Sequence, residues 1–302
     1  MAEEKLSPAN RGGVWKRLRA LSPYSAAKRY KAEAANANGR LQKLEPELKR
    51  VRRELRGVTR IKDECEREIR VAEKMIQRLL AECGALPLPP PSLRVHVGRV
   101  AFPGNFLRQG ADSSAQVLEV FGEDPGGPVL DWGCGTGRTL SWLRRLEAWR
   151  ANYHGCDVDP QAIAWLKSQG VERVEVCQDL PPLPYPDNSF VGLFCFSVLT
   201  HIPPKDHAAW YAEIHRVLKP GGRAYVTVHS DKNMVEGKTF TDEEREAYFR
   251  EGSSWSEREG HYKHAATVTR AFTESAVPPG LRIERYRLAG YHNMDDLILR
   301  KR

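Results

Sequence analysis

The chain has 302 residues, of which 41% are hydrophobic and 28% charged. This length exceeds the ~150 to 220 residues that one globular core needs, so we expect one domain with an appended segment. The sequence contains no run of ~18 apolar residues and no apolar stretch before a cleavage-like site near its start. This pattern argues against a transmembrane or secreted protein. We expect a soluble, cytoplasmic protein.

The cysteines are scattered along the chain. None forms a C-x-x-C pair, and none has the histidine spacing of a zinc site. We therefore expect reduced thiols, most of them buried, and predict no metal site. The six are Cys65, Cys83, Cys134, Cys156, Cys177 and Cys195.

The net charge of +8 is concentrated at one end of the chain. Residues 1–83 hold 21 Lys+Arg and 12 Asp+Glu, or +9, so the other 219 residues hold 26 and 27, or −1. A basic segment is typical of proteins that bind nucleic acid or touch an anionic membrane surface. The near-neutral remainder argues against a nucleic-acid substrate there but does not exclude one.

Residues 41–83 carry apolar side chains at a mean spacing of 3.5 residues, from Leu41 to Cys83, among many Arg, Lys and Glu residues. This spacing is typical of a coiled-coil seam. We expect a helix over 46–83 after a looser basic helix over 25–44, because Pro46 breaks or starts a helix. Self-association as a homo-oligomer is favoured over a solvated helix packed on its own domain.

Gly84 and the prolines that follow it predict a helix stop and a stiff linker over 84–101. After it, over 102–302, short apolar runs alternate with helical patterns, which predicts a doubly wound, mostly parallel α/β sheet. Residues 281–288 and 295–302 are joined by too short a connection for a parallel crossover, so we expect an antiparallel hairpin at the sheet edge. Strands are expected over 128–132, 152–158, 171–178, 190–198 and 222–229, and helices over 137–149, 160–169 and 206–218.

The stretch PVLDWGCGTGR runs from a strand into glycines and then a helix, the usual place for a ligand in an open α/β sheet. A dinucleotide fingerprint, G-x-G-x-x-G/A, would begin at Gly133 and Gly135 but meets Arg138 at its third position. Arginine does not fit where the helix and strand must pack closely. The pattern that remains is acid-x-G-x-G-x-G, which begins at Asp131 and ends at Gly137.

These residues resemble the class I S-adenosylmethionine-dependent methyltransferases. The resemblance continues in order through HGCDVDP, CQDLPPLPYPDNSF, FCFSVLTHIPP and VLKPGGRAYVTVH, and covers about residues 102–302. It implies a seven-stranded Rossmann-like sheet, with one antiparallel strand inserted at the edge, and S-adenosylmethionine as cofactor. Where the family usually has Phe-Asp, this chain has Phe190-Val191, so no acid is assigned there.

The same resemblance implies a set of cofactor-binding residues. Asp157 would hold the ribose hydroxyls, Asp179 would lie near the adenine amino group, and the backbone of Leu180 would face the ring. Asp159 is better interpreted as a helix cap. The full implied set is Asp131, Gly133, Cys134, Gly135, Gly137, Asp157, Val158, Asp179, Leu180 and Ser197.

A general base is needed only where the methyl acceptor loses a proton, as a sugar hydroxyl does. The candidates are His201, after the fourth strand, and His229, ending the fifth; His292 and Asp296 are weaker. Each has an alternative structural role. The aromatic insertion over 230–266 and the segment 102–110 are candidates for covering the site, with Thr241 and Glu244 as a capping box.

No Asn-Pro-Pro-Tyr-like element follows the fourth strand, which disfavours methylation of a base amino group. The composite sequence resembles bacterial methyltransferases associated with polysaccharide and glycan biosynthesis, which implies O-methylation of a sugar or related small metabolite. Two alternatives stay open. One is an RNA methyltransferase that grips its substrate with the basic segment; the other is a non-catalytic scaffold with a vestigial cofactor domain.

Overall fold

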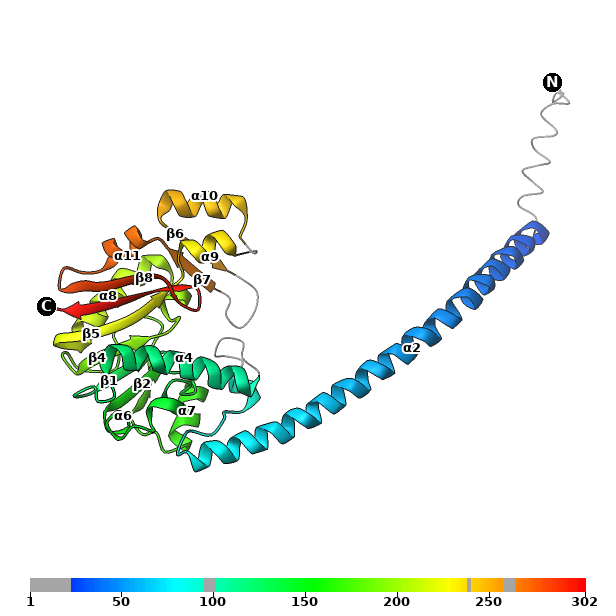
Figure 1. Ribbon diagram of the computed structural model, residues 1–302. Coiled ribbons are helices and arrows are strands. Elements are labelled where there is room, and N and C mark those ends of the chain that lie inside the picture. The colour runs from blue at the N-terminus through cyan, green and yellow to red at the C-terminus, as the bar shows by residue number, and fades with distance from the viewer. Residues whose placement is uncertain (1–22, 95–101, 238–239, 258–263) are drawn as a thin grey trace, which may run out of the picture. The chain divides into compact units, whose positions relative to one another are not determined.

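Figure 1 shows a computed structural model of the chain, which describes residues 23–94, 102–237, 240–257 and 264–302. The chain divides into two compact units, Met1–Ala72 and Glu73–Arg302. Parts of the predicted extension (1–22), linker (95–101) and insertion (238–239 and 258–263) lie outside the described residues.

Helix α2 is a single 60-residue helix, Pro23–Glu82. The predicted break at Pro46 is wrong, because Pro46 lies inside the helix. A proline removes only one backbone hydrogen bond, here to the carbonyl of residue 42, which is exposed to water. None of the described helices is long and apolar enough to cross a membrane.

The apolar row on α2 is exposed to solvent within the first compact unit. Leu41 and Leu55 are each 63% exposed, and Ile61 is 60% exposed. The predicted helix is therefore present, and its apolar row is exposed among the described residues of the first unit. Its apolar residues from Leu41 to Ile61 do not pack on a core.

The second unit is built on a seven-stranded sheet of order β3-β2-β1-β4-β5-β9-β8. Strands β1 to β5 are parallel, and β9 pairs antiparallel with both β5 and β8. The expected α/β sheet with its terminal antiparallel hairpin is thus confirmed. The strands are β1 Val129–Trp132, β2 Tyr153–Asp157, β3 Val174–Val176, β4 Phe190–Cys195, β5 Leu218–Val228, β8 Leu281–Tyr291 and β9 Met294–Lys301.

Helices cover both faces of this sheet. Alternate strand residues point to opposite faces, so Leu130 joins one core cluster while its neighbour Val129 joins the other. The Leu130 cluster includes Trp210 and Ile214 of α8, and the Val129 cluster includes Val117 of α4. The helices and 3-10 turns of this unit are α3 Pro91–Arg94, α4 Pro103–Phe121, α5 Leu140–Leu143, α6 Glu147–Asn152, α7 Pro160–Ser168, η1 Leu199–His201, η2 Pro204–Asp206, α8 His207–Val217 and α11 Arg270–Ala276.

The helix expected over 137–149 is two short helices instead, α5 and α6. Leu146 between them has extended backbone angles (φ −89°, ψ 126°). The bend allows the indole of Trp149 to be fully buried while its Nε1–H donates to the carbonyl of Gly122 at 3.0 Å. Tertiary packing overrides local helix propensity here.

The segment after α2 packs on the domain rather than standing apart from it. Leu86 is 1% exposed and belongs to the Val129 cluster, and Leu88 packs with Phe106 and with Ile76 of α2. The second compact unit accordingly begins at Glu73, earlier than the predicted boundary at residue 83.

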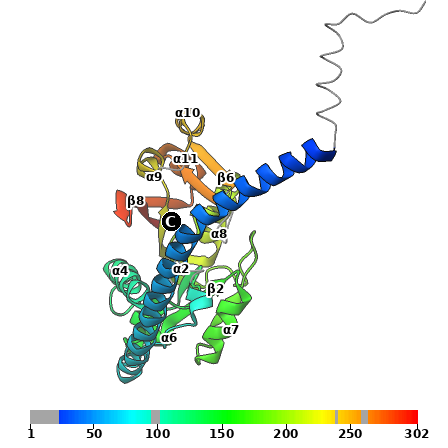
Figure 2. The ribbon, with the colours of Figure 1, turned by 90° about the vertical axis from the view of Figure 1, so that its right-hand side faces the viewer.

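The insertion after β5 folds into its own small layer. It contains α9 Asp231–Glu236 and α10 Asp242–Glu251, followed by the antiparallel pair β6 Ser253–Glu257 and β7 His264–Val268. Helices α9 and α10 lie together with β6 at the top of the domain in Figures 1 and 2. The predicted capping box is confirmed, because Thr241 and Glu244 bond each other's backbone N–H groups.

Candidate active site

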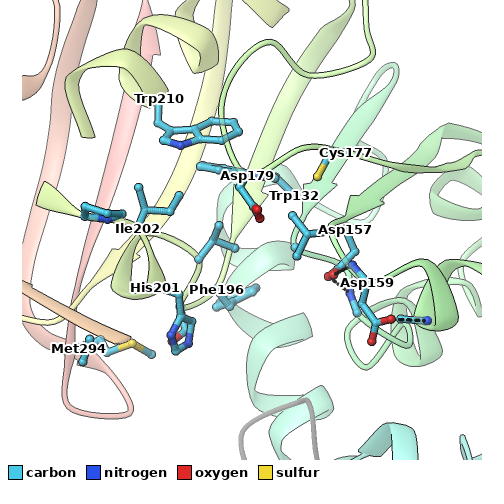
Figure 3. A pocket seen from close by; sticks show the side chains of 18 of the residues that line it. Trp132, Asp157, Asp159, Cys177, Asp179, Phe196, His201, Ile202, Trp210 and Met294 are labelled. Carbon is cyan, nitrogen blue, oxygen red and sulfur yellow. Dashed lines mark hydrogen bonds between the residues drawn. The ribbon is translucent and has the colours of Figure 1, made fainter. Parts of the chain in front are cut away.

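A large cleft of about 1640 Å³ lies at the carboxyl ends of the parallel strands, where open α/β sheets bind ligands. It brings together eight of the residues that the sequence analysis names as candidates: Gly133, Gly135, Asp157, Val158, Asp179, Ser197, His201 and the weaker candidate His292. Figure 3 shows several of its side chains.

The three glycines of the loop all have positive φ, but they serve different purposes. Gly133 (φ 81°) and Gly135 (φ 51°) line the cleft, whereas Gly137 (φ 74°) does not. A Cβ on Gly137 would lie 2.9 Å from Leu86 and 2.8 Å from Leu166, so this glycine allows close core packing. Gly137 was predicted as a cofactor-binding residue, but it shapes the backbone of the loop and does not line the cleft.

Asp157 ties the end of β2 to the glycine loop. Its Oδ2 accepts the N–H of Gly135 at 2.7 Å, and its Oδ1 accepts the N–H of Asp159 at 2.9 Å. Burial raises the pKa of Asp157 above its ordinary value. Asp159 caps α7 by accepting from Gln161 N–H at 2.8 Å, as expected. The carboxylate of Asp157 therefore sits at the rim between two parallel strands, in reach of a ligand on the loop.

Asp131 lies beneath the cleft and is not among its lining residues. It is 3% exposed, and its Oδ2 accepts the hydroxyl proton of Tyr153 at 2.9 Å. Burial raises the pKa of Asp131 to about 7. The buried thiol of Cys134 is also outside the lining, so these two predicted residues support the loop from below.

One wall of the cleft is aromatic. Trp132, at the end of β1, stacks on Trp210 of α8 with ring centroids 4.4 Å apart. Figure 3 shows Asp179 beside this pair. Leu180 is 56% exposed and lies outside the lining, so the cleft meets Asp179 but not the predicted leucine.

A tight turn after β4 carries His201 to the cleft. Ser197 has φ 62°, and its N–H donates to Thr227 Oγ1 at 2.7 Å. The buried ring of His207 then bonds the carbonyls of Leu199 and Ile202 through Nε2, at 3.1 and 3.0 Å. Two carbonyl partners require a proton on Nε2, so His207 donates to both and fixes the turn from below.

His201 itself lines the cleft, with Phe196 and Met294 beside it in Figure 3. His229 is half-buried and is not a lining residue; its carbonyl accepts the N–H of Val268. Of the weaker candidates, His292 lines the cleft with its Nε2 3.3 Å from Asp112 Oδ2. Asp296 is fully buried against Arg287.

Several lining residues lie outside the predicted set of cofactor-binding and catalytic residues. The insertion supplies Trp255 and Glu251, the α4 segment supplies Gln109, and the segment before it supplies Leu93. The first three had a signal, because they lie in the insertion over 230–266 and the segment 102–110, both expected to cover the site. Leu93 had none, since only long-range packing brings it to the cleft.

The charges of the described lining residues suit a cationic ligand better than a phosphate. Four carboxylates line the cleft, against two permanent cations, Arg138 and Lys205. A dinucleotide needs positive charge or helix N–H groups at its pyrophosphate. S-adenosylmethionine carries a sulfonium and an ammonium group and has no phosphate, so the residues present fit it. The four are Asp157, Asp159, Asp179 and Glu251.

Comparison with known proteins agrees with this chemistry. Residues 130–226 match the family model described as "Methyltransferase domain". This segment includes most of β1 to β5 and the cleft-lining residues from Trp132 to Trp210. The match and the named relatives support an S-adenosylmethionine-dependent methyltransferase domain here.

Individual relatives share only part of their length with the chain. The chain is 33% identical over 120 residues to methyltransferase GfsG of Streptomyces halstedii (38% of this chain, 42% of that protein). It is 29% identical over 133 residues to sterol 24-C-methyltransferase ERG6B of Gibberella zeae (42% and 34%). It is 34% identical over 119 residues to the malonyl-[acyl-carrier protein] O-methyltransferase of Herminiimonas arsenicoxydans (39% and 42%). The chain thus spans less than half of each of these relatives.

Among solved structures, the PH0226 protein of Pyrococcus horikoshii aligns with a TM-score of 0.49 and 16% identity, covering 65% of this chain and 90% of that one. The relatives' names include carbon and oxygen methyltransferases. These names therefore do not identify the methyl acceptor of this chain.

Proposed function

We propose that this protein is an S-adenosylmethionine-dependent methyltransferase that methylates a hydroxyl group of a sugar, glycan or related small metabolite. The observation that carries the proposal is the hydrogen bond from Gly135 N–H to the Asp157 carboxylate at the cleft rim. It joins the glycine loop and the acid implied by the family resemblance at one place. The match over 130–226 supports the same assignment.

In this proposal the chain's own residues hold the donor. Asp157 and Asp179 are suited to accept hydrogen bonds from a ribose diol and an adenine amino group. The Trp132 and Trp210 pair supplies an apolar wall beside Asp179. When bound, S-adenosylmethionine supplies a methyl carbon attached to a positively charged sulfur.

The acceptor would bind where His201, Trp255 and Tyr291 line the cleft. His201 would take the proton that a hydroxyl group must lose on methylation. Alignment of the acceptor oxygen with the methyl carbon supplies much of the rate, since such a transfer depends on positioning. The polar residues Glu251 and His292 on this side favour a hydroxylated acceptor over a purely apolar one.

Calorimetric titration with S-adenosylmethionine tests the donor assignment. Wild-type protein should bind, and Gly135→Val should not, because valine is strained at φ 51° at a position that lines the cleft. Gly170→Val is the matched control: Gly170 also has positive φ (76°), but a Cβ there meets nothing within 4 Å. Absence of wild-type binding at high micromolar cofactor would refute the proposal.

The acceptor requires a separate experiment. The protein is incubated with methyl-labelled cofactor and a fractionated extract of its own source, and the labelled product is identified. A labelled sugar methyl ether supports the proposal. Labelled RNA would support the RNA alternative, together with steep loss of binding with salt, and a labelled sterol or other lipid would refute the sugar assignment.

A further inference from the structure

The exposed apolar row of α2 follows a heptad pattern with one polar position over residues 41–72. Taking Leu41 as position a, every a and d position in this range is apolar except Lys62. Ile61, one residue earlier, falls at the flanking g position. The a residues are Leu41, Leu48, Leu55, Lys62 and Ile69, and the d residues are Leu44, Val51, Val58, Cys65 and Ala72.

The row is exposed to solvent within the first unit. Leu48 and Val51 are each 49% exposed, and Val58 is 62% exposed. Beyond Ala72 the apolar residues of α2 are packed. Ile76 and Leu80 contact Leu88 and Phe106 within the second unit. A seam of more than four heptads therefore stays available, which is long enough for a stable two-stranded coil.

We propose that α2 forms a parallel, in-register two-stranded coiled coil with a second copy of this chain over residues 41–72. A repeating a/d seam is self-complementary, so an identical helix fits it layer by layer. The proposal goes beyond the methyltransferase assignment and does not depend on it.

Charge and polarity favour the parallel, in-register arrangement. In it, position g of one helix faces position e of the next heptad on the partner, which pairs Arg40 with Glu45 and Glu47 with Arg52. These two pairs join opposite charges, and the pairs Glu54 with Thr59 and Ile61 with Glu66 bring no like charges together. The next pair would be Glu68 with Glu73, but Glu73 lies beyond the proposed coil and forms an ion pair with Arg94. Lys62 then meets only its own copy, in a single layer, with its ammonium group reaching water along its aliphatic stem. A shifted or antiparallel pairing would place Lys62 against apolar layers twice.

The in-register arrangement also brings two Cys65 thiols to one d layer. Cys65 and Cys83 are exposed, and the other four cysteines are buried. Diamide can therefore join Cys65 across the pair: two thiols lose two protons and two electrons to form one disulfide, and the diazene is reduced to a hydrazine. Cys83 lies beyond the proposed coil and supplies the control.

The test uses the full chain. Light scattering should give a dimer mass, and diamide should give a covalent dimer that is lost in Cys65→Ser and retained in Cys83→Ser. A monomer would overturn the proposal. A dimer without the Cys65 cross-link would overturn the parallel register.

Two point variants probe the seam itself. Leu55→Glu places a charge at position a and should weaken the dimer by roughly 100-fold or more. Gly57→Glu adds the same charge at an outward position c and should leave it intact. Lys62→Leu should tighten association, because a lysine at a costs stability. Equal effects of Leu55→Glu and Gly57→Glu, or a Lys62→Leu dimer that is no tighter, would contradict the heptad assignment.

Discussion

The side-chain amide of Gln77 pairs with both backbone groups of Leu88. Its Nε2 donates to the Leu88 carbonyl at 3.0 Å, and its Oε1 accepts the Leu88 N–H at 2.9 Å. Nearby, Glu73 pairs with the buried guanidinium of Arg94. The last turns of α2 thereby hold the segment that delivers Leu93 to the cleft.

Gln77→Ala should destabilise the second unit by about 1–3 kcal/mol, because it leaves two backbone groups without their partner. Chemical denaturation followed by domain fluorescence measures this loss. Arg78→Ala is the control, since Arg78 is exposed on the same helix turn. Gln77→Glu keeps the acceptor but loses the donor, so its unfolding free energy should lie between those of Gln77→Ala and the control Arg78→Ala. Equal stability of all variants would contradict this role of Gln77.

Truncation should show where the domain begins. A chain lacking residues 1–72 keeps Glu73, Ile76 and Gln77 and should unfold at the same denaturant concentration as the domain in the full chain. A chain lacking residues 1–83 loses all three and should unfold earlier, by at least as much as Gln77→Ala. If both truncations behave alike, the boundary predicted at residue 83 is the better one.

Asp131 should make the domain less stable as pH rises. Burial holds its pKa at about 7 in the folded chain, against an ordinary value of 3.8. Between these values the folded state keeps a proton that the unfolded state has lost, so stability falls as pH rises from about 4 to about 7. The shift corresponds to about 4 kcal/mol across this range.

Asp131→Asn keeps an oxygen that can accept from Tyr153 and removes the titration. The difference in unfolding free energy between variant and wild type, measured from pH 4 to pH 8, should therefore move in favour of the variant as pH rises. A difference that is independent of pH would show that Asp131 does not titrate in this window.

His207→Leu should change the environment of His201 by altering the turn that carries it, although His201 itself is not substituted. The change removes the donor shared by the Leu199 and Ile202 carbonyls and should cost about 1–3 kcal/mol of stability. The imidazole resonances of His201 should shift in the NMR spectrum. His154→Leu removes a ring-to-carbonyl contact on β2, away from this turn, and serves as control; identical His201 resonances in both variants would rule out a positioning role for His207.

Local patterns predicted the elements that carry their own signal. The alternation of apolar runs and helices predicted the parallel sheet, and the short connection after residue 288 predicted the hairpin of β8 and β9. Two helix boundaries differ from the prediction for different reasons. The helix at Pro46 continues because the carbonyl that loses its hydrogen bond is on an exposed helix. The helix over 137–149 bends because long-range packing buries Trp149.

Some residues of the candidate site could likewise be predicted from the sequence, and others could not. Gly135 and Asp157 could be predicted because they lie just beyond the end of β1 and at the end of β2, and neighbouring parallel strands end at one edge. The role of His207 could not, because its partners are backbone carbonyls that carry no sequence signal. His229 follows a strand too, yet it is absent from the cleft lining while its carbonyl joins β7.

The position of β9 has a consequence for synthesis of the chain. Residues 294–301 are made after every other strand but lie between β5 and β8, pairing Val226 with Leu297 and Arg287 with Asp296. Until they leave the ribosome, β5 presents a long open edge and β8 has no place in the sheet. The sheet therefore cannot close strand by strand in chain order, and until β9 pairs with β5 an unpaired strand edge is open to other chains.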